Sequence, residues 1–272
     1  MKNELAMRLL SRCRLTPRVA RRQILALSSF EQGLFRPDLC SSAEPIRTPF
    51  EDSDIDEPVR WLSDPAGTFM YRTGKPMRSR GVIWNHTHPV PVGKDDSGKP
   101  YRFPHPERIF LNYWTSSFDG EWIRKTGIGK VQSFVTEMFQ AAGADFGLLT
   151  SHADLDAKNY LVLHRGKTIS KRYRGLDPAL GVPGLYWMNL FSPRLAQWLG
   201  LERLPGELDI IKRFSSDGVL LQFGESPEEC RSPEILHRQQ RSIDLLGQQR
   251  FFDIHRPDRE LEHPDWPPMS SE

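Results

Sequence analysis

From Gly67 onward the sequence alternates between two hydrophobic periodicities, and this alternation restricts the fold more than any other feature. Residues 130–142 place six apolar side chains at helical spacing, and Gly143 follows where a C-terminal cap belongs. Residues 208–214 and 219–223 have the composition of strands and flank a segment that ends in Asp-Gly, which favours a hairpin turn. The chain is therefore expected to form both helices and antiparallel strands.

Further segments extend this pattern along the chain. Ser-Pro pairs at residues 192 and 232 predict the first turns of two more helices, and Ser151 with Asp154 predicts a helix up to about residue 161. No internal repeat of about 20–50 residues is present. We therefore predict an α+β fold, a single domain with a mixed, largely antiparallel sheet packed against helices. The other predicted strands cover residues 68–72, 81–86, 108–115, 146–150 and 185–191.

Charge is distributed unevenly over the first 57 residues. Residues 1–30 hold seven basic residues and one acidic residue, a charge of +6, whereas residues 31–57 hold two basic and eight acidic residues, a charge of −6. Thr16 followed by proline predicts a basic helix that packs on the domain, and an organellar targeting segment is the alternative. The run at residues 51–57 predicts a solvated acidic loop, with a contact for a basic partner as the alternative.

These patterns divide the chain into three predicted parts. Residues 1–60 form an N-terminal extension that contains the basic helix and the acidic loop. Residues 61–255 form the α+β domain, and residues 256–272 form a proline-rich tail that is extended or disordered.

Composition argues against several classes of protein. The 37 basic and 35 acidic residues leave a net charge of only +2, which is too small for a protein that coats nucleic acid. No run of about 18 uncharged apolar residues is present, so we expect no membrane-spanning helix. Cys13, Cys40 and Cys230 lie far apart and indicate a reducing compartment. We predict a cytoplasmic protein that contacts neither nucleic acid nor a membrane.

Motifs that would carry catalysis are incomplete. His86 and His88 have the spacing of two metal ligands, but no second motif supplies a third. A metal-dependent hydrolase that uses this pair is the alternative function. Cys230 has no neighbouring base, and the glycines at residues 127–130 do not complete a phosphate-binding loop. We predict no enzymatic activity, no catalytic, metal-binding or cofactor-binding residues, and no cofactor.

The strongest local signal lies between residues 173 and 200. Its rim combines aromatic and arginine side chains, which are enriched in protein interfaces. The alternative is that Tyr186 and Trp187 belong to the core of a strand.

The same segment resembles the bacterial immunity proteins of polymorphic toxin systems, most closely the immunity protein 52 family and more loosely the type VI secretion immunity proteins. The matching residues are Arg174–Asp177, Pro183–Trp187, Asn189 and Ser192–Gly200, and the likeness extends from about Gly129 to Phe252. The resemblance implies a protein without catalytic activity that binds and neutralises a cognate antibacterial toxin. In this family the toxin is typically a restriction-endonuclease-like nuclease.

An inhibitor of a nuclease would meet a basic cleft, for which carboxylates and aromatic side chains are suited. The predicted partner is therefore a toxin protein, a nuclease effector. The sequence leaves open whether the immunity protein forms a homodimer. We predict that its partner-binding residues are Glu51, Asp52, Asp54, Asp56, Glu57, Tyr173, Arg174, Tyr186, Trp187 and Asn189.

Overall fold

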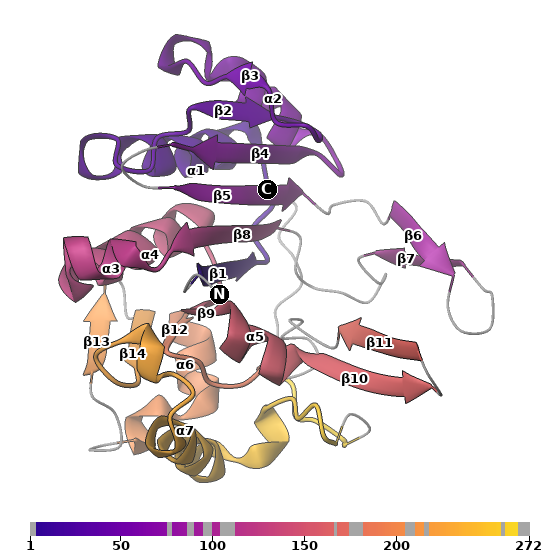
Figure 1. Ribbon diagram of the computed structural model, residues 1–272, viewed down its shortest axis with the longest axis vertical. Coiled ribbons are helices and arrows are strands. Elements are labelled where there is room, and N and C mark those ends of the chain that lie inside the picture. The colour runs from indigo at the N-terminus through magenta and orange to yellow at the C-terminus, as the bar shows by residue number, and fades with distance from the viewer. Residues whose placement is uncertain are drawn as a thin grey trace. The chain divides into compact units, whose positions relative to one another are not determined.

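The structure, a computed structural model, describes residues 4–74, 78–85, 90–94, 100–103, 112–165, 168–173, 182–204, 210–214, 218–256 and 259–265 (Figure 1). They form two compact units, a first that ends at Gly147 and a second that begins at Leu148. Both units combine antiparallel strands with helices, which confirms the predicted α+β class. Among the described residues no helix is long and apolar enough to cross a bilayer.

The first unit is built on antiparallel strands in the order β1-β8-β5-β4-β2-β3. β1 and β8 pair along their whole lengths, from Glu4 opposite Asp119 to Ser11 opposite Asn112. A separate hairpin of two short strands, β6 and β7, belongs to the same unit. The strands are β1 (Glu4–Ser11), β2 (Leu39–Ser41), β3 (Thr48–Pro49), β4 (Thr68–Thr73), β5 (Ser79–Asn85), β6 (Val90–Lys94), β7 (Pro100–Phe103) and β8 (Asn112–Asp119).

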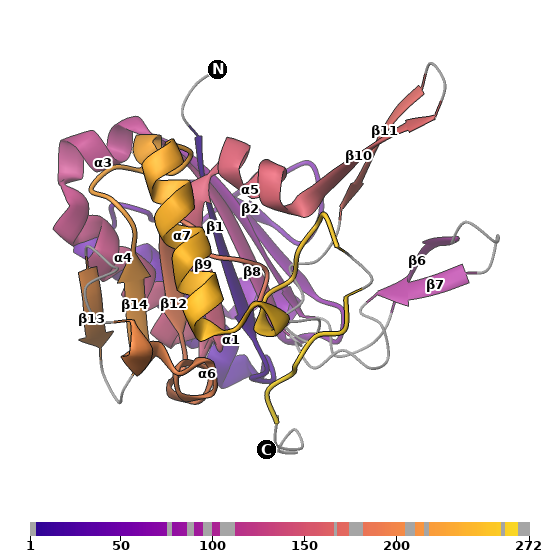
Figure 2. The ribbon, with the colours of Figure 1, turned by 90° about the horizontal axis from the view of Figure 1, so that it is seen from below.

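Helices α1 and α4 pack against each other in the first unit, and Figure 2 shows them beside its strands. The side chain of Thr16 accepts a hydrogen bond from the backbone of Val19, so the predicted N-cap of the basic helix is confirmed. Gly143 takes the left-handed conformation predicted for the end of α4. The helices of this unit are α1 (Pro17–Ser29), α2 (Asp56–Ser63), α3 (Glu121–Thr126) and α4 (Ile128–Ala142), with 3₁₀ turns η1 (Phe30–Gln32) and η2 (Asp52–Asp54).

Aromatic rings form the centre of the first unit's core. Phe35 stacks on Phe134 of α4 with ring centroids 3.9 Å apart, and Trp122 of α3 and Phe118 of β8 meet Phe134 edge-on at 5.5 and 5.6 Å. All four side chains are buried. Edge-to-face and offset-stacked pairs stabilise a core beyond the area they bury, so these rings join two helices to the sheet.

A polar contact crosses three strands inside the same sheet. The hydroxyl groups of Tyr71 on β4 and Ser116 on β8 are hydrogen-bonded, and Trp114 Nε1 donates to both oxygens at 3.1 Å. Gly81 on β5 lies between them, because a Cβ atom there would be 2.4 Å from the Tyr71 hydroxyl oxygen. Only glycine leaves room for this contact.

The second unit contains three antiparallel strands in the order β13-β14-β12, together with a separate hairpin of β10 and β11 that follows α5 (Figure 2). α6 packs on β12 and β14. β9 carries the chain from the first unit into the second. The elements are β9 (Phe146–Ser151), α5 (His152–Asn159), β10 (Tyr160–Arg165), β11 (Thr168–Tyr173), β12 (Met188–Phe191), α6 (Pro193–Leu199), η4 (Leu201–Arg203), β13 (Ile210–Phe214), β14 (Gly218–Gln222), η5 (Pro227–Glu229), α7 (Pro233–Leu246) and η6 (Gln248–Arg250).

The first 60 residues and part of the proline-rich tail both contribute to the two units. The first unit includes β1 and α1, because Leu5, Leu9 and Leu10 are buried in the strand that pairs with β8. Part of the predicted tail is also attached to the second unit. Glu262 accepts a hydrogen bond from Arg250 Nε at 3.1 Å, and its backbone N–H donates to Gln249.

Removing a large side chain from either core should destabilise the chain. We expect Phe139→Ala in α4 and Trp187→Ala before β12 each to lower the free energy of unfolding by about 3–5 kcal/mol, because both side chains are buried. Leu25→Ala and Leu245→Ala are matched controls, since these leucines are 45% and 48% exposed. Urea denaturation would measure all four, and an unchanged midpoint for either core variant would contradict its assignment.

The buried tyrosine should make stability depend on alkaline pH. Burial raises the pKa of Tyr71 from 10.0 to about 12, against the opposing effect of its hydrogen bonds with Ser116 and Trp114. Between those values the unfolded chain loses a proton that the folded chain keeps, so the stabilisation present below pH 10 is lost as the pH rises toward 12. Between pH 10 and 12 the free energy of unfolding should therefore fall by about 2–3 kcal/mol less in Tyr71→Phe than in the wild type. Denaturation series at several pH values would measure this difference. Parallel pH profiles for the two proteins would contradict it.

Candidate functional site

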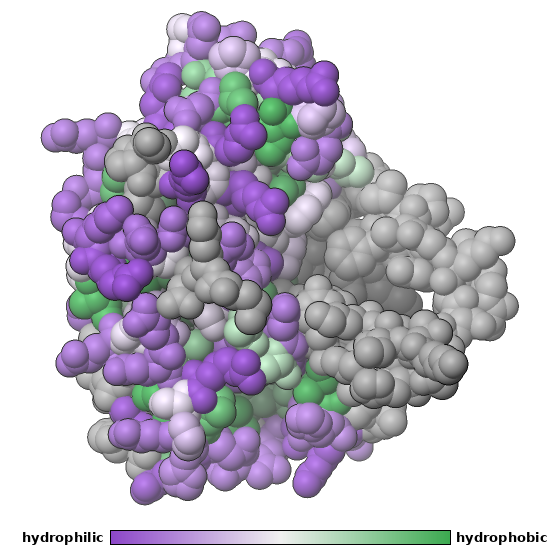
Figure 3. All heavy atoms as spheres, in the orientation of Figure 1, coloured by the Kyte–Doolittle hydropathy of each residue, from purple (hydrophilic) through white to green (hydrophobic). Residues whose placement is uncertain are grey.

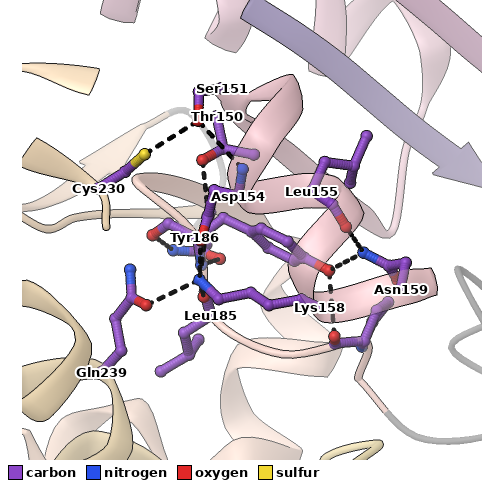
Figure 4. A network of polar contacts seen from close by, with 12 residues as sticks. Thr150, Ser151, Asp154, Leu155, Lys158, Asn159, Leu185, Tyr186, Cys230 and Gln239 are labelled. Carbon is purple, nitrogen blue, oxygen red and sulfur yellow. Dashed lines mark hydrogen bonds and ion pairs between the residues drawn. The ribbon is translucent and has the colours of Figure 1, made fainter. Parts of the chain in front are cut away.

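A network of buried polar side chains lies where β9 ends and α5 begins, within the second unit (Figure 4). The Ser151 hydroxyl oxygen accepts a hydrogen bond from the backbone N–H of Asp154 at 3.1 Å, as the sequence predicts for this turn. Thr150 Oγ1 donates to Asp154 Oδ2 at 2.8 Å. Asp154 is only 1% exposed, so its carboxylate is held in a fixed position away from solvent.

Lys158, one helical turn after Asp154, pairs with this carboxylate. Its Nζ atom lies 2.8 Å from Asp154 Oδ1 and 3.0 Å from Oδ2. The same ammonium group donates to the backbone oxygen of Leu185 at 2.7 Å and to Gln239 Oε1 at 2.8 Å. Its Nζ atom also lies 4.9 Å from the centre of the Tyr186 ring. Lys158 therefore joins α5, the segment before β12 and α7 (Figure 4).

The protonation of Lys158 reflects two opposing effects. Burial lowers the pKa of the ammonium group, while the charge and hydrogen bond of Asp154 raise it, and burial has the larger effect. The three N–H bonds of a lysine ammonium can serve three acceptors, and Asp154, Leu185 and Gln239 supply them. The geometry therefore fits a cation that ties elements together rather than a nucleophile.

Three residues predicted for the partner surface are part of this interior. Tyr186, Trp187 and Asn189 have no exposed surface. Tyr186 OH donates to the backbone oxygen of Pro183 at 3.1 Å, and Trp187 Nε1 donates to the backbone oxygen of Gly224 at 3.3 Å. The structure corrects this part of the prediction, because a side chain inside the core cannot contact a partner that docks on the folded chain.

Asn189 has a local structural role instead. Its Oδ1 atom accepts from the Tyr186 backbone N–H and its Nδ2 atom donates to the Tyr186 backbone oxygen, both at 2.8 Å. These bonds pair both backbone groups of a buried residue. The residues that carry the resemblance to the immunity proteins and that the structure describes, 183–187, 189 and 192–200, thus include much of the second unit's core.

A pocket of about 460 Å³ lies beside Lys158 and is lined by residues of the second unit only. The apolar part of its wall is formed by Leu236, Ile243 and Phe251, and the polar part includes Lys158 and Gln239. Both polar side chains are already bonded to each other. The pocket therefore has a volume suited to a small ligand, but the ammonium group of Lys158 already has its hydrogen-bond acceptors.

The acidic surface, which we define as Glu51, Asp52, Asp54, Asp56 and Glu57, lies in the first unit. The structure corrects most of the predicted loop: Glu51 precedes η2 in an extended conformation, Asp52 and Asp54 belong to η2, and Asp56 and Glu57 start α2, whose N-terminus favours acidic side chains. Glu57 is half-buried and the other four are exposed. Asp52 pairs with Arg36 Nε at 2.9 Å, and Asp56 pairs with Arg21 of α1. Within the described part of the chain, Glu51 and Asp54 form no ion pair.

The remaining sequence-based site residues fall elsewhere. Arg174, His86 and His88 lie outside the described residues, and only the backbone of Tyr173 is described, in β11. In the part of the chain that the structure describes, no group of three or more His, Cys, Asp and Glu side chains could hold a metal ion. The three cysteines are free thiols, and Cys230 Sγ lies 3.1 Å from Ser151 Oγ.

The sequence interpretation did not include Lys158. The spacing of Asp154 and Lys158 on one helix was a signal for an ion pair. The sequence does not indicate its acceptor on α7, because Gln239 lies 81 residues later in the chain.

Comparisons with known proteins give little direct guidance. No protein-family model matches the sequence, and a search of curated proteins finds no match. Among solved structures, the chain is similar to the Pseudomonas aeruginosa T6SS protein PA0821, with 13% identity, a TM-score of 0.49, and coverage of 87% of this chain and 72% of that one. The resemblance to the immunity protein 52 family stays a prediction.

The ion pair of the buried Asp154 carboxylate with the half-buried Lys158 should matter far more than an exposed pair of the same spacing. We expect Lys158→Met to lower the free energy of unfolding by about 3–5 kcal/mol, because it leaves the buried Asp154 carboxylate without its cation. Lys125→Met is the matched control: Lys125 pairs with Glu121 four residues earlier at 3.3 Å, and both side chains are exposed. Its effect should stay within about 0.5 kcal/mol. Equal effects of the two substitutions in urea denaturation would contradict the structural role of Lys158.

Proposed function

We propose that the chain is a non-catalytic, cytoplasmic immunity protein of a bacterial toxin system, such as one that uses type VI secretion. We propose that it binds and neutralises a cognate nuclease toxin. The observation that carries the proposal is the acidic surface of η2 and α2. It presents carboxylates to solvent from a fixed backbone rather than from a loop. Fixed carboxylates suit a basic, phosphate-seeking partner, because the two electrostatic fields are complementary.

Buried anchors and ion pairs hold the acidic surface in place. Phe50 and Ile55 are buried on either side of η2. The Arg36 guanidinium lies 5.5 Å from the centre of the Phe50 ring and also pairs with Asp52. A surface fixed before binding loses less conformational freedom when a partner docks, which supports tight recognition.

Charge is a better candidate than apolar contact for the first recognition step. On the one face that Figure 3 shows, hydrophilic side chains dominate among the coloured residues, and apolar ones lie in small separate patches. The large apolar side chains that are exposed in the described chain are Leu25, Leu236 and Leu245. Single exposed leucines are ordinary for a protein surface and do not define a docking site.

The proposal predicts that the two unpaired carboxylates steer association. Glu51→Gln with Asp54→Asn should slow association with the protein encoded next to this chain's gene and change dissociation less, because charges at an interface rim act on the encounter rate. In the wild type, the association rate should fall as salt rises from about 50 to 500 mM. Surface plasmon resonance would measure both rates. The double variant should fold normally, since both side chains are exposed.

A matched variant separates a local effect from a change of total charge. Asp156→Asn with Glu260→Gln removes two exposed carboxylates in the second unit and should leave association unchanged. Equal slowing by both double variants would remove the acidic surface from the interface. No binding by the wild type at micromolar concentration would overturn the immunity proposal. Stoichiometric zinc in the purified protein, together with a hydrolytic activity that His86→Ala abolishes, would favour the metal-dependent hydrolase instead.

A further inference from the structure

A second charged site lies in the first unit, at the ends of four neighbouring strands. The start of β1 and the end of β8 meet the hairpin end of β4 and β5 there (Figure 1). A cleft of about 640 Å³ opens at this point, and every residue that lines it belongs to the first unit. This volume is within the usual range for sites that bind small molecules.

Three arginines line the cleft without a counterion among the described residues. Arg72, Arg78 and Arg80 are exposed, and none of their guanidinium groups forms a hydrogen bond or ion pair within that part of the chain. Arg72 and Arg80 are direct partners in the antiparallel pairing of β4 and β5, so their side chains leave the same face of the sheet. Like charges in directly opposite positions are unfavourable unless an anion lies between them.

The backbone that carries these arginines is fixed. The buried hydroxyl groups of Thr73 and Ser79 are 2.9 Å apart and join the strand ends beside Arg72 and Arg80. The Ser79 backbone N–H also donates to Thr73 Oγ1 at 2.8 Å. The hairpin register is therefore set by buried contacts, and the backbone that carries the two arginines needs little reorganisation when a ligand binds.

Carboxylates lie in the same cleft without neutralising the arginines. Glu4, Asp38 and Asp119 line it, and none of them forms an ion pair with a residue that the structure describes. The backbone N–H of Asp38 donates to the Arg72 carbonyl at 2.9 Å, which fixes the two residues side by side. Three cations and three anions leave the lining with no net charge, so a polyanion such as nucleic acid gains little here. A ligand that carries opposite charges of its own matches both groups.

We propose that this cleft binds a small molecule that carries both a phosphate group and an ammonium group. The Arg72 and Arg80 guanidiniums would hold the phosphate, because guanidinium forks match the oxygens of phosphate. Asp38 would accept a hydrogen bond from the ammonium group, and so would Asp119 through Oδ2, since its Oδ1 already accepts the Glu121 backbone N–H at 3.1 Å. This site is separate from the acidic surface, so it goes beyond the proposed inhibition of a toxin.

Phosphoethanolamine is a suitable probe, with inorganic phosphate and β-alanine as partial mimics. Calorimetric titration of the full chain should show that phosphoethanolamine binds more tightly than either mimic. The variant Arg72→Lys with Arg80→Lys keeps the charge but loses the forks, and it should weaken phosphoethanolamine binding by about tenfold or more. Asp38→Asn should weaken phosphoethanolamine but not inorganic phosphate.

Arg14→Lys with Arg18→Lys is the matched control, since these arginines are exposed and do not line the cleft. It should bind phosphoethanolamine as the wild type does. Equal weakening by both double variants, or no heat of binding at millimolar phosphoethanolamine, would overturn the proposal. Equally tight β-alanine binding would overturn the assignment of phosphate. Circular dichroism would verify that each variant is folded, and toxin binding by the cleft variants would stay intact because the acidic surface is unchanged.

Discussion

The pairing of β1 with β8 is the constraint on which the first unit depends. Beyond the ladder itself, the end of β1 is tied to the loop after α4: the Asp145 backbone N–H donates to the Leu10 carbonyl at 2.8 Å, and Ser11 Oγ donates to the Gly143 carbonyl at 2.7 Å. The first strand is thus held by segments more than 100 residues later in the sequence. An N-terminal segment bonded in this way belongs to the core, whatever its charge, because its backbone groups have their partners there.

That placement also explains why the opposite charges of the first 57 residues stay on one unit. Arg21 of α1 pairs with Asp56, and Arg36 pairs with Asp52, so the basic and acidic stretches partly neutralise each other. Exposed ion pairs of this kind contribute about 0–1 kcal/mol each, and we therefore do not regard them as the source of stability. Their effect is to orient η2 and α2, which leaves Glu51 and Asp54 as the uncompensated charges.

The features that the sequence predicts correctly are those whose physics is local. The serine caps before α6 and α7 form as expected, because a hydroxyl group and a backbone N–H three residues later are always close in a helix start. β1 could not be predicted, since its partner strand lies about a hundred residues away and Arg8 interrupts its apolar run. Trp187 shows the same limit at the candidate site: alternation of apolar residues does not distinguish a core strand from an interface strand.

Net charge conceals both sites of the first unit. Arginines and carboxylates nearly cancel over the chain, yet charges act over about 8 Å at physiological salt, so only their local grouping matters to a ligand. The two groups differ in geometry. On the acidic surface the arginines touch the carboxylates, whereas in the cleft Arg72 and Asp38 are neighbours whose side chains form no ion pair. Charges that pair with each other within the fold orient its elements, whereas charges that the sheet holds apart remain available to a ligand.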